Sequence, residues 1–218
     1  MKKSTSAYRI NIKRPVYAEV TSDTEEGTAY GEVKSLGEAQ QAQITASVAA
    51  GQLYGDGAIV DSSAIMTGLS LVLSTTKVPI ETQADIYNYK VTDGVVQVKA
   101  GVKPKYIAVG YEVEQTDGSS ELVWLLKGRP QPLNSDVKQS EGNINYSTDS
   151  ITIDFVRRKS DNMLKFFADG SNPELTKAQA DAWFNEGPSK PVSANKEVMD
   201  EDENNQSETD RPNTDTTE

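Results

Sequence analysis

The residues best suited to take part in a chemical reaction are two glutamates, Glu112 and Glu114. Glu121 lies a few positions further along the chain. Side chains two apart on a strand point to the same face, and a pair of carboxylates can act as the acid and the base of glycoside hydrolysis. Like charges at this spacing are also typical of a solvated strand face, and no pattern of a catalytic cleft accompanies them. We therefore favour a solvated face and keep a glycosidase built on Glu112 and Glu114 as an alternative.

Other catalytic and ligand-binding chemistry is poorly represented. The chain has no cysteine and no histidine, which excludes thiol nucleophiles, disulfides, imidazole bases and the usual zinc and copper ligands. Its Asp-Gly pairs are turn signals, because no series of alternating ligands closed by a glutamate forms a calcium loop. The sequence predicts no catalytic, cofactor-binding or metal-binding residues, and therefore a protein that is not an enzyme.

The charge of the chain is unevenly distributed. The net charge is −11, and residues 189–218 contribute nine acidic and three basic side chains with almost no large apolar ones. Such a segment cannot bury enough surface to offset its ordering entropy. We expect a folded domain over residues 1–188 and a disordered acidic tail over 189–218.

An acidic chain of this composition is not expected to bind nucleic acid, because phosphate contacts need lysine and arginine to replace counterions. No run approaches about 18 apolar residues, so neither a secretion signal nor a membrane span is predicted. Small basic clusters, such as Lys99-Lys103-Lys105 and Arg157-Arg158-Lys159, are interpreted as solubility charges. Pairing with an acidic patch on another copy of the chain is the alternative.

The glutamates must be positioned by a β-hairpin. Two runs of alternating side chains, from Ile107 and from Leu122, flank an Asp117-Gly118 turn signal. A regular hairpin of this kind predicts a sheet with one packed face and one face free for another role. Glu112 and Glu114 lie on the mixed face with Ala108 and Gly110.

The rest of the chain reads as mainly β, with about eight strands, one central helix and one short C-terminal helix. The central helix is expected over residues 79–89, and the C-terminal helix over 176–184 behind a Thr176/Gln179 capping box. Residues 49–63 read as a long Gly- and Asp-rich loop. The expected strands cover residues 8–20 with a break or bend at Pro15, 30–33, 44–48, 68–75, 95–98, the two hairpin runs, and 150–156 paired with 163–167.

Several short blocks of sequence, spread over about residues 8–185, carry a resemblance through their order and spacing. They are Val16-Tyr17-Ala18 leading to Gly27 and Tyr30, LYGDG at 53–57, GLSLVL and PIETQ at 68–83, VTDGVV at 91–96, YIAVGY and VWLLKG at 106–128, ITIDFVRR at 151–158, LKFFAD at 164–169 and AQADAWF at 178–184. In these blocks the chain resembles the major tail proteins, or tail tube proteins, of long non-contractile-tailed phages (siphoviruses) of Gram-positive bacteria. The acidic segment after Pro188 is not required by that pattern.

The resemblance implies a tail-tube fold, a β-sandwich or barrel with one flanking helix, assembled as stacked hexameric rings. The protein would then be located in the tail of the virion after assembly in the host cytoplasm. Its partners would be further copies of itself, the tape-measure protein and tail-tip or terminator proteins, while DNA passes through without specific binding. Leu53, Tyr54 and Asp56 become candidates for a subunit contact, and Glu112 and Glu114 for the lumen or a subunit seam.

A second class of function is a β-sandwich surface or decoration module that binds carbohydrate or protein. Modules of this class typically expose aromatic platforms and often carry secretion signals, and neither is evident in the sequence.

Overall fold

The computed structural model describes residues 7–137, 139 and 147–188. The predicted acidic tail, 189–218, lies outside the described residues, and its disorder stays a prediction. The elements within the described residues are β1 (Arg9–Asp23), β2 (Thr28–Ser35), β3 (Ala39–Gly55), β4 (Ala58–Thr75), α1 (Ile80–Tyr87), β5 (Lys90–Thr92), β6 (Val95–Gln97), β7 (Ile107–Gln115), β8 (Ser120–Pro130), β9 (Asn134–Asp136), β10 (Thr148–Phe155), β11 (Lys165–Asp169) and α2 (Lys177–Ala182).

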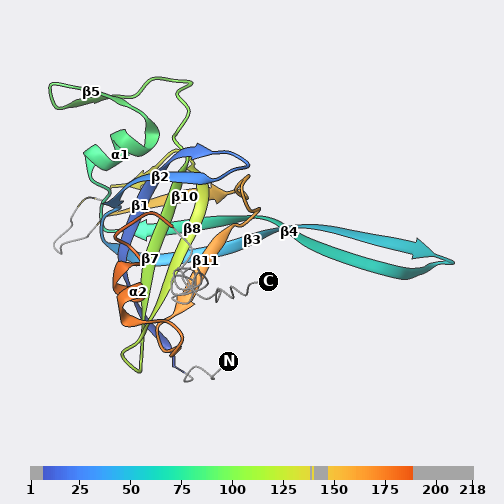
Figure 1. Cartoon of the computed structure of the whole chain (residues 1–218). Helices are drawn as coiled ribbons and strands as arrows, with labels where there is room; N and C mark the ends of the chain where they lie inside the picture. The colour runs from blue at the N-terminus through green and yellow to red at the C-terminus, as the bar shows by residue number, and fades with distance from the viewer. Residues whose placement is uncertain (1–6, 138, 140–146, 189–218) are drawn as a thin grey trace, which may run out of the picture.

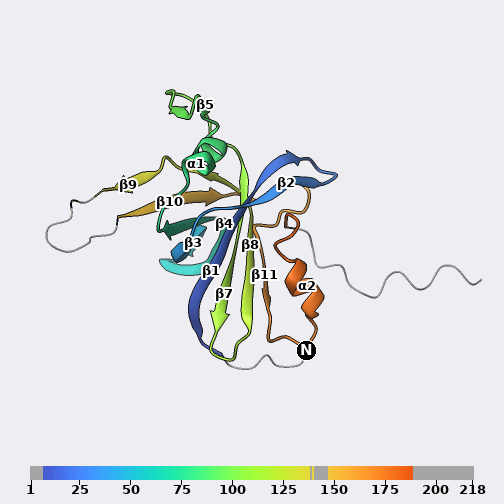
Figure 2. The same ribbon diagram turned by 90° about the vertical axis from the view of Figure 1, so that its left-hand side faces the viewer.

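Nine of these strands form one antiparallel sheet in the order β2-β1-β7-β8-β10-β4-β3, with β11 added to β8 and β9 to β10. The strands β5 and β6 form a separate two-stranded hairpin. The sheet is strongly bent, so that β1, β7 and β8 cross the direction of β3 and β4 (Figures 1 and 2). A mainly β fold with a flanking helix and a short C-terminal helix is therefore confirmed.

The main core lies inside the bend of the sheet. Alternate residues of β4 and β10, such as Leu71 and Ile153, are fully buried and meet Val109 of β7 and Leu125 of β8. Period-two alternation places these side chains on one face of each strand. The helix α1 closes one end of this core through the buried Ile86.

The hairpin of β7 and β8 is packed on both faces, contrary to the expectation of one free face. On the second face, Trp124 is 1% exposed and lies against Phe184, with ring centroids 5.7 Å apart. Its indole nitrogen donates a hydrogen bond to the carbonyl of Trp183 at 2.9 Å. A Cβ at Gly110 would come within 2.9 Å of both rings, so the glycine is what lets the C-terminal segment approach. This face therefore belongs to a second small core, around Trp124 and Phe184. Its mixture of apolar and polar residues did not predict that core.

Two local predictions are confirmed and one pairing is wrong. Thr176 and Gln179 form the expected capping box at α2, and β1 bends near Pro15, where its register with β7 shifts and Arg14 has a φ of 50°. The strand β11, however, pairs with β8 and not with β10. Both edges of β10 are already occupied at its C-terminal end, by β4 and by β8.

The helix α1 is tied to the sheet by a charged cluster around Asp85. Its carboxylate accepts hydrogen bonds from Lys105 at 2.6 Å, Lys34 at 2.8 Å and the Tyr17 hydroxyl at 2.9 Å. Burial alone would raise the pKa of Asp85, but the hydrogen bonds from Lys105 and Lys34 outweigh it and hold that pKa far below its usual range. The folded state therefore favours the ionised carboxylate.

This cluster predicts a loss of stability in acid. Because the pKa of Asp85 is lower in the folded chain than in the unfolded chain, its contribution is complete above about pH 4, the unfolded pKa, and is lost as the pH falls further. We expect Asp85→Asn to lower the free energy of unfolding at pH 7 by about 1–3 kcal/mol and to flatten the decline below pH 4. Thermal unfolding across pH 2–7 measures both effects, and Asp93→Asn in the exposed turn between β5 and β6 is the control. If the stability of Asp85→Asn fell below pH 4 as steeply as that of the parent, Asp85 would not be the source of the acid sensitivity.

Candidate subunit interface

The most exposed structure in the fold is a long two-stranded hairpin formed by the distal halves of β3 and β4. We call residues 48–67 the arm. Its strands pair from Val48 opposite Met66 to Gly55 opposite Ala58, and Asp56 and Gly57 turn the chain with φ values of 50° and 78°. Figure 1 shows the arm extending away from the body of the protein. The predicted loop over 49–63 is therefore wrong, because these residues continue the ladder begun in the body.

The arm exposes apolar side chains on both faces. Every arm residue whose exposure is described is exposed. Tyr54 on one face is 63% exposed, and Leu53 on the other is 62% exposed; adjacent residues of a strand point to opposite faces. The large exposed apolar side chains of the arm are Val48, Leu53, Tyr54, Ile59, Val60, Ile65 and Met66. An isolated two-stranded hairpin is marginal in water, and the arm leaves these apolar side chains uncovered.

The strand β3 is also an unguarded sheet edge. Of the described strands it pairs only with β4, and its 17 residues include no charged side chain and no proline. Soluble monomers usually protect such edges with charges, prolines or bulges, because an open edge is a template for pairing with another chain. The β3–β4 ladder contains bulges, but β3 has neither charges nor prolines, so its outer edge is open to pairing with another strand.

The predicted contact residues Leu53, Tyr54 and Asp56 are brought together at the tip of the arm. The Tyr54 hydroxyl donates a hydrogen bond to Gln52 at 2.8 Å, and Asp56 occupies the turn. Their role as contacts stays a prediction, and the sequence analysis missed the long two-stranded element that carries them. The available signal was Asp56-Gly57 between two uncharged runs, which is a hairpin pattern.

The predicted residues Glu112 and Glu114 lie on β7 beside basic residues of β1. Glu114 forms an ion pair with Lys13 at 2.7 Å, and Glu112 lies 3.9 Å from Arg14. The hydrogen bond from Lys13 is the main cause that lowers the pKa of Glu114. Both carboxylates thus belong to a cross-strand ladder of opposite charges, a role that suits a sheet surface.

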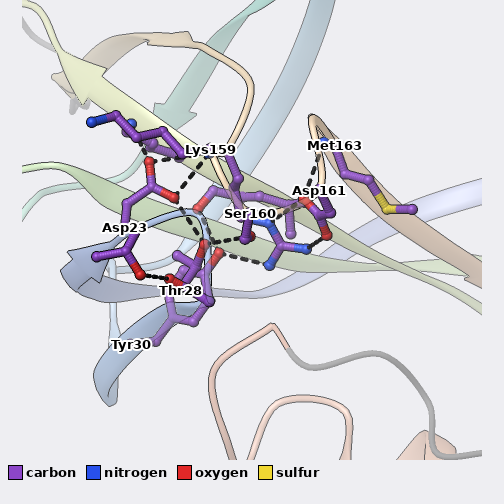
Figure 3. A network of polar contacts seen from close by, with 12 residues as sticks. Asp23, Thr28, Tyr30, Lys159, Ser160, Asp161 and Met163 are labelled. Carbon is purple, nitrogen blue, oxygen red and sulfur yellow. Dashed lines mark hydrogen bonds and ion pairs between the residues drawn. The ribbon is translucent and has the colours of Figure 1, made fainter.

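A second polar cluster joins the turn between β1 and β2 to the segment between β10 and β11 (Figure 3). Arg158, 5% exposed, donates to the Asp161 carboxylate and, at 3.1 Å, to the Tyr30 hydroxyl. Asp23 accepts from Lys127 at 2.5 Å and from the backbone N–H of Lys159 at 3.0 Å. Burial would raise the pKa of Asp23, but these hydrogen bonds outweigh it and lower that pKa.

This cluster surrounds an open depression of about 660 Å³. Four of the charged groups of the cluster form ion pairs with one another, Lys127 with Asp23 and Arg158 with Asp161. We interpret it as a structural tie that fixes two neighbouring loops.

Among the described residues, no group of acidic side chains is arranged to hold a metal ion. None of the helices in the described part of the chain is long and apolar enough to cross a membrane.

Comparison with known proteins gives limited information. No protein-family model and no curated protein matches the chain. A chain of an extracellular contractile injection system, in a PVC sheath-tube complex in the extended state, is similar at 14% identity and a TM-score of 0.39, over 74% of this chain and 93% of that chain. A chain of the anti-feeding prophage (AFP) baseplate is similar at 11% identity and a TM-score of 0.41, over 75% and 97%. A chain of the PVC sheath/tube terminator is similar at 12% identity and a TM-score of 0.39, over 75% and 99%.

Two of these chains thus belong to an extracellular contractile injection system and one to the anti-feeding prophage baseplate. Likeness at this level carries no functional argument.

Proposed function

We propose that the chain is a structural protein of a phage-type tail, which polymerises as stacked hexameric rings into a tube that conducts DNA during ejection. The observation that carries the proposal is the arm together with the β3 edge. The arm exposes large apolar side chains and the β3 edge carries no charge; a monomer leaves both open to water, and a second copy can cover them. The ordered resemblance of the sequence to tail tube proteins supports the same conclusion.

The strand order favours a ring. β2 and β3 stand at opposite ends of the order, so pairing β3 of one copy with β2 of the next continues the sheet from copy to copy. A contact between two different surfaces is heterologous, and such contacts generate closed rings when the rotation closes. Leu53, Tyr54 and Asp56 would belong to the contacts between copies.

Glu112 and Glu114 would line the lumen or a subunit seam. Their pairing with Arg14 and Lys13 leaves that surface charged but locally balanced. DNA could pass such a surface without being held, because strong binding needs unpaired cations that replace counterions. The tape-measure protein and tail-tip or terminator proteins would be the partners inside and at the ends of the tube, in the tail of a virion assembled in the host cytoplasm.

Electron microscopy of the purified chain tests the proposal. We expect rings or tubes with a repeating subunit as the concentration rises, together with concentration-dependent sedimentation. A species that stays monomeric at high concentration would contradict self-assembly and favour a module that binds another protein or a carbohydrate. Absence of glycoside hydrolysis in the parent chain would exclude the alternative based on Glu112 and Glu114.

A further inference from the structure

The arm contains the charged residues of the segment 39–75, which comprises β3, β4 and the turn between them, and both of these residues are acidic. Asp56 and Asp61 are its charged residues, and no lysine or arginine occurs in β3 or β4. Neither aspartate has an ion-pair partner among the described residues. The arm therefore presents two free negative charges beside its exposed apolar side chains.

The small hairpin of β5 and β6, with the segment that follows it, has the opposite charge. We call residues 88–104 the basic end. It carries Lys90, Lys99 and Lys103 against one acidic residue, Asp93, and all three lysines are exposed. In the described part of the chain, none of these lysines has an ion-pair partner.

The basic end also exposes apolar side chains beside its lysines. The exposed fractions are 52% for Val91, 61% for Val95 and 70% for Val98. Among the described strands, β5 and β6 pair only with each other. Free lysines beside exposed valines match free aspartates beside exposed Leu53 and Tyr54, so the two surfaces are complementary in both charge and hydrophobicity.

The two surfaces point away from each other. The arm leaves one side of the body, while α1 and the β5–β6 hairpin occupy the opposite upper side (Figure 1). One molecule therefore cannot satisfy its own pair of surfaces. A copy displaced along the direction of the arm can, and repetition of that contact extends without closing.

We propose that the arm of one copy docks on the basic end of another copy, through Asp56 and Asp61 against Lys90, Lys99 and Lys103, and that this contact joins successive rings. The inference rests on the proposed function and names the receiving surface for the arm. A second copy is favoured over an unrelated partner because each chain carries both complementary surfaces, the arm and the basic end. In a chain with a net charge of −11, copies repel one another in general, and a local pairing of opposite charges sets their orientation.

Charge reversal tests the contact. One variant carries Asp56→Lys and Asp61→Lys, a second carries Lys90→Glu and Lys99→Glu, and a third carries all four changes. At low ionic strength we expect each two-site variant to raise the critical concentration for tube growth at least about tenfold, since like charges are then brought together. The four-site variant restores complementarity with the signs exchanged, and its critical concentration should return close to that of the parent.

The matched control carries Arg157→Glu and Lys177→Glu, which change the net charge as much as Lys90→Glu and Lys99→Glu do, at exposed sites away from both surfaces. We expect it to grow tubes like the parent. If the parent forms tubes and both two-site variants grow equally well, or if the four-site variant is no better than either of them, the docking is wrong while the tube stands. If the parent itself forms neither rings nor tubes, the proposed function fails with it.

Discussion

Replacing residues 50–64 with an Asn-Gly turn is expected to abolish the stacking of rings into tubes while leaving the fold of the body intact. The shortened strands keep the pairs Val48–Met66 and Ala49–Ile65, and an Asn-Gly turn suits a two-residue hairpin connection. We expect the free energy of unfolding to change by less than about 1 kcal/mol, because the removed side chains contact solvent and not the core. Sedimentation velocity and electron microscopy measure assembly, and denaturant unfolding measures the fold.

The physical reason is the distribution of apolar surface. Each large side chain covered on association contributes about 1.5–3 kcal/mol when it is fully withdrawn from water, and the arm exposes several of them without packing any against its own body. Part of that gain is offset by the lost freedom of the associating molecules. Even so, removing all of it should shift the critical concentration beyond the range in which the parent assembles.

Two further variants show which property of the arm matters. Leu53→Ser with Tyr54→Ser keeps the backbone hairpin and removes two apolar side chains, and we expect it to weaken assembly strongly. Val137→Ser with Phe167→Ser removes exposed apolar side chains elsewhere and should assemble like the parent. An arm-less chain that builds tubes at the parent's critical concentration would show that the β3 edge or another surface carries the contact.

Prediction from sequence succeeded where the determining interactions are local. The capping box of Thr176 and Gln179 requires only neighbours in the chain. The turn at Asp117-Gly118 between β7 and β8 likewise depends on the positive φ that glycine tolerates, 82° at Gly118. These features are encoded within a few residues and appear where they were expected.

The errors concern interactions between distant segments. The residues Ala49, Ala50 and Gly51 have weak strand propensity, so they read as a loop, yet the ladder started by the buried half of β4 continues through them. The segment after Asn162 was expected to pair with β10, the strand that precedes it in sequence. It pairs with β8 instead, where Phe166 lies opposite Trp124. No local pattern records which edges of a strand are already occupied.

The same distinction applies to the candidate interface. Leu53, Tyr54 and Asp56 stand in one short block of sequence, so their common location could be predicted, while their role as contacts stays a prediction. The charged ladder around Glu112 and Glu114 could not, because Lys13 and Arg14 are about a hundred residues away in the chain and meet them only through the pairing of β1 with β7. The complementary surfaces at the two ends of the molecule depend in the same way on the folded shape.

The substitution Trp124→Ala should cost about 3–5 kcal/mol of stability and detach the C-terminal segment from the sheet. Trp124 fills the space between Gly110 and Phe184, and its indole N–H satisfies the carbonyl of Trp183. The alanine variant leaves both a cavity and an unpaired carbonyl. Trp124→Phe keeps part of the volume without the donor, and its stability should fall between those of the parent and the alanine variant.

The chain offers a built-in probe for this effect, because its two tryptophans, Trp124 and Trp183, both belong to the second core. In Trp124→Ala the remaining emission comes from Trp183, which is 9% exposed in the fold, and a red shift would report its exposure to water before global unfolding. Phe167→Ala is the matched control: the side chain it truncates lies on β11 opposite Val123 and is 70% exposed, so its cost should stay within about 0.5 kcal/mol. If Trp124→Ala unfolds at the parent's denaturant midpoint with an unshifted Trp183 emission, the C-terminal segment is not held by this packing, and the hairpin has the free face that its sequence predicts.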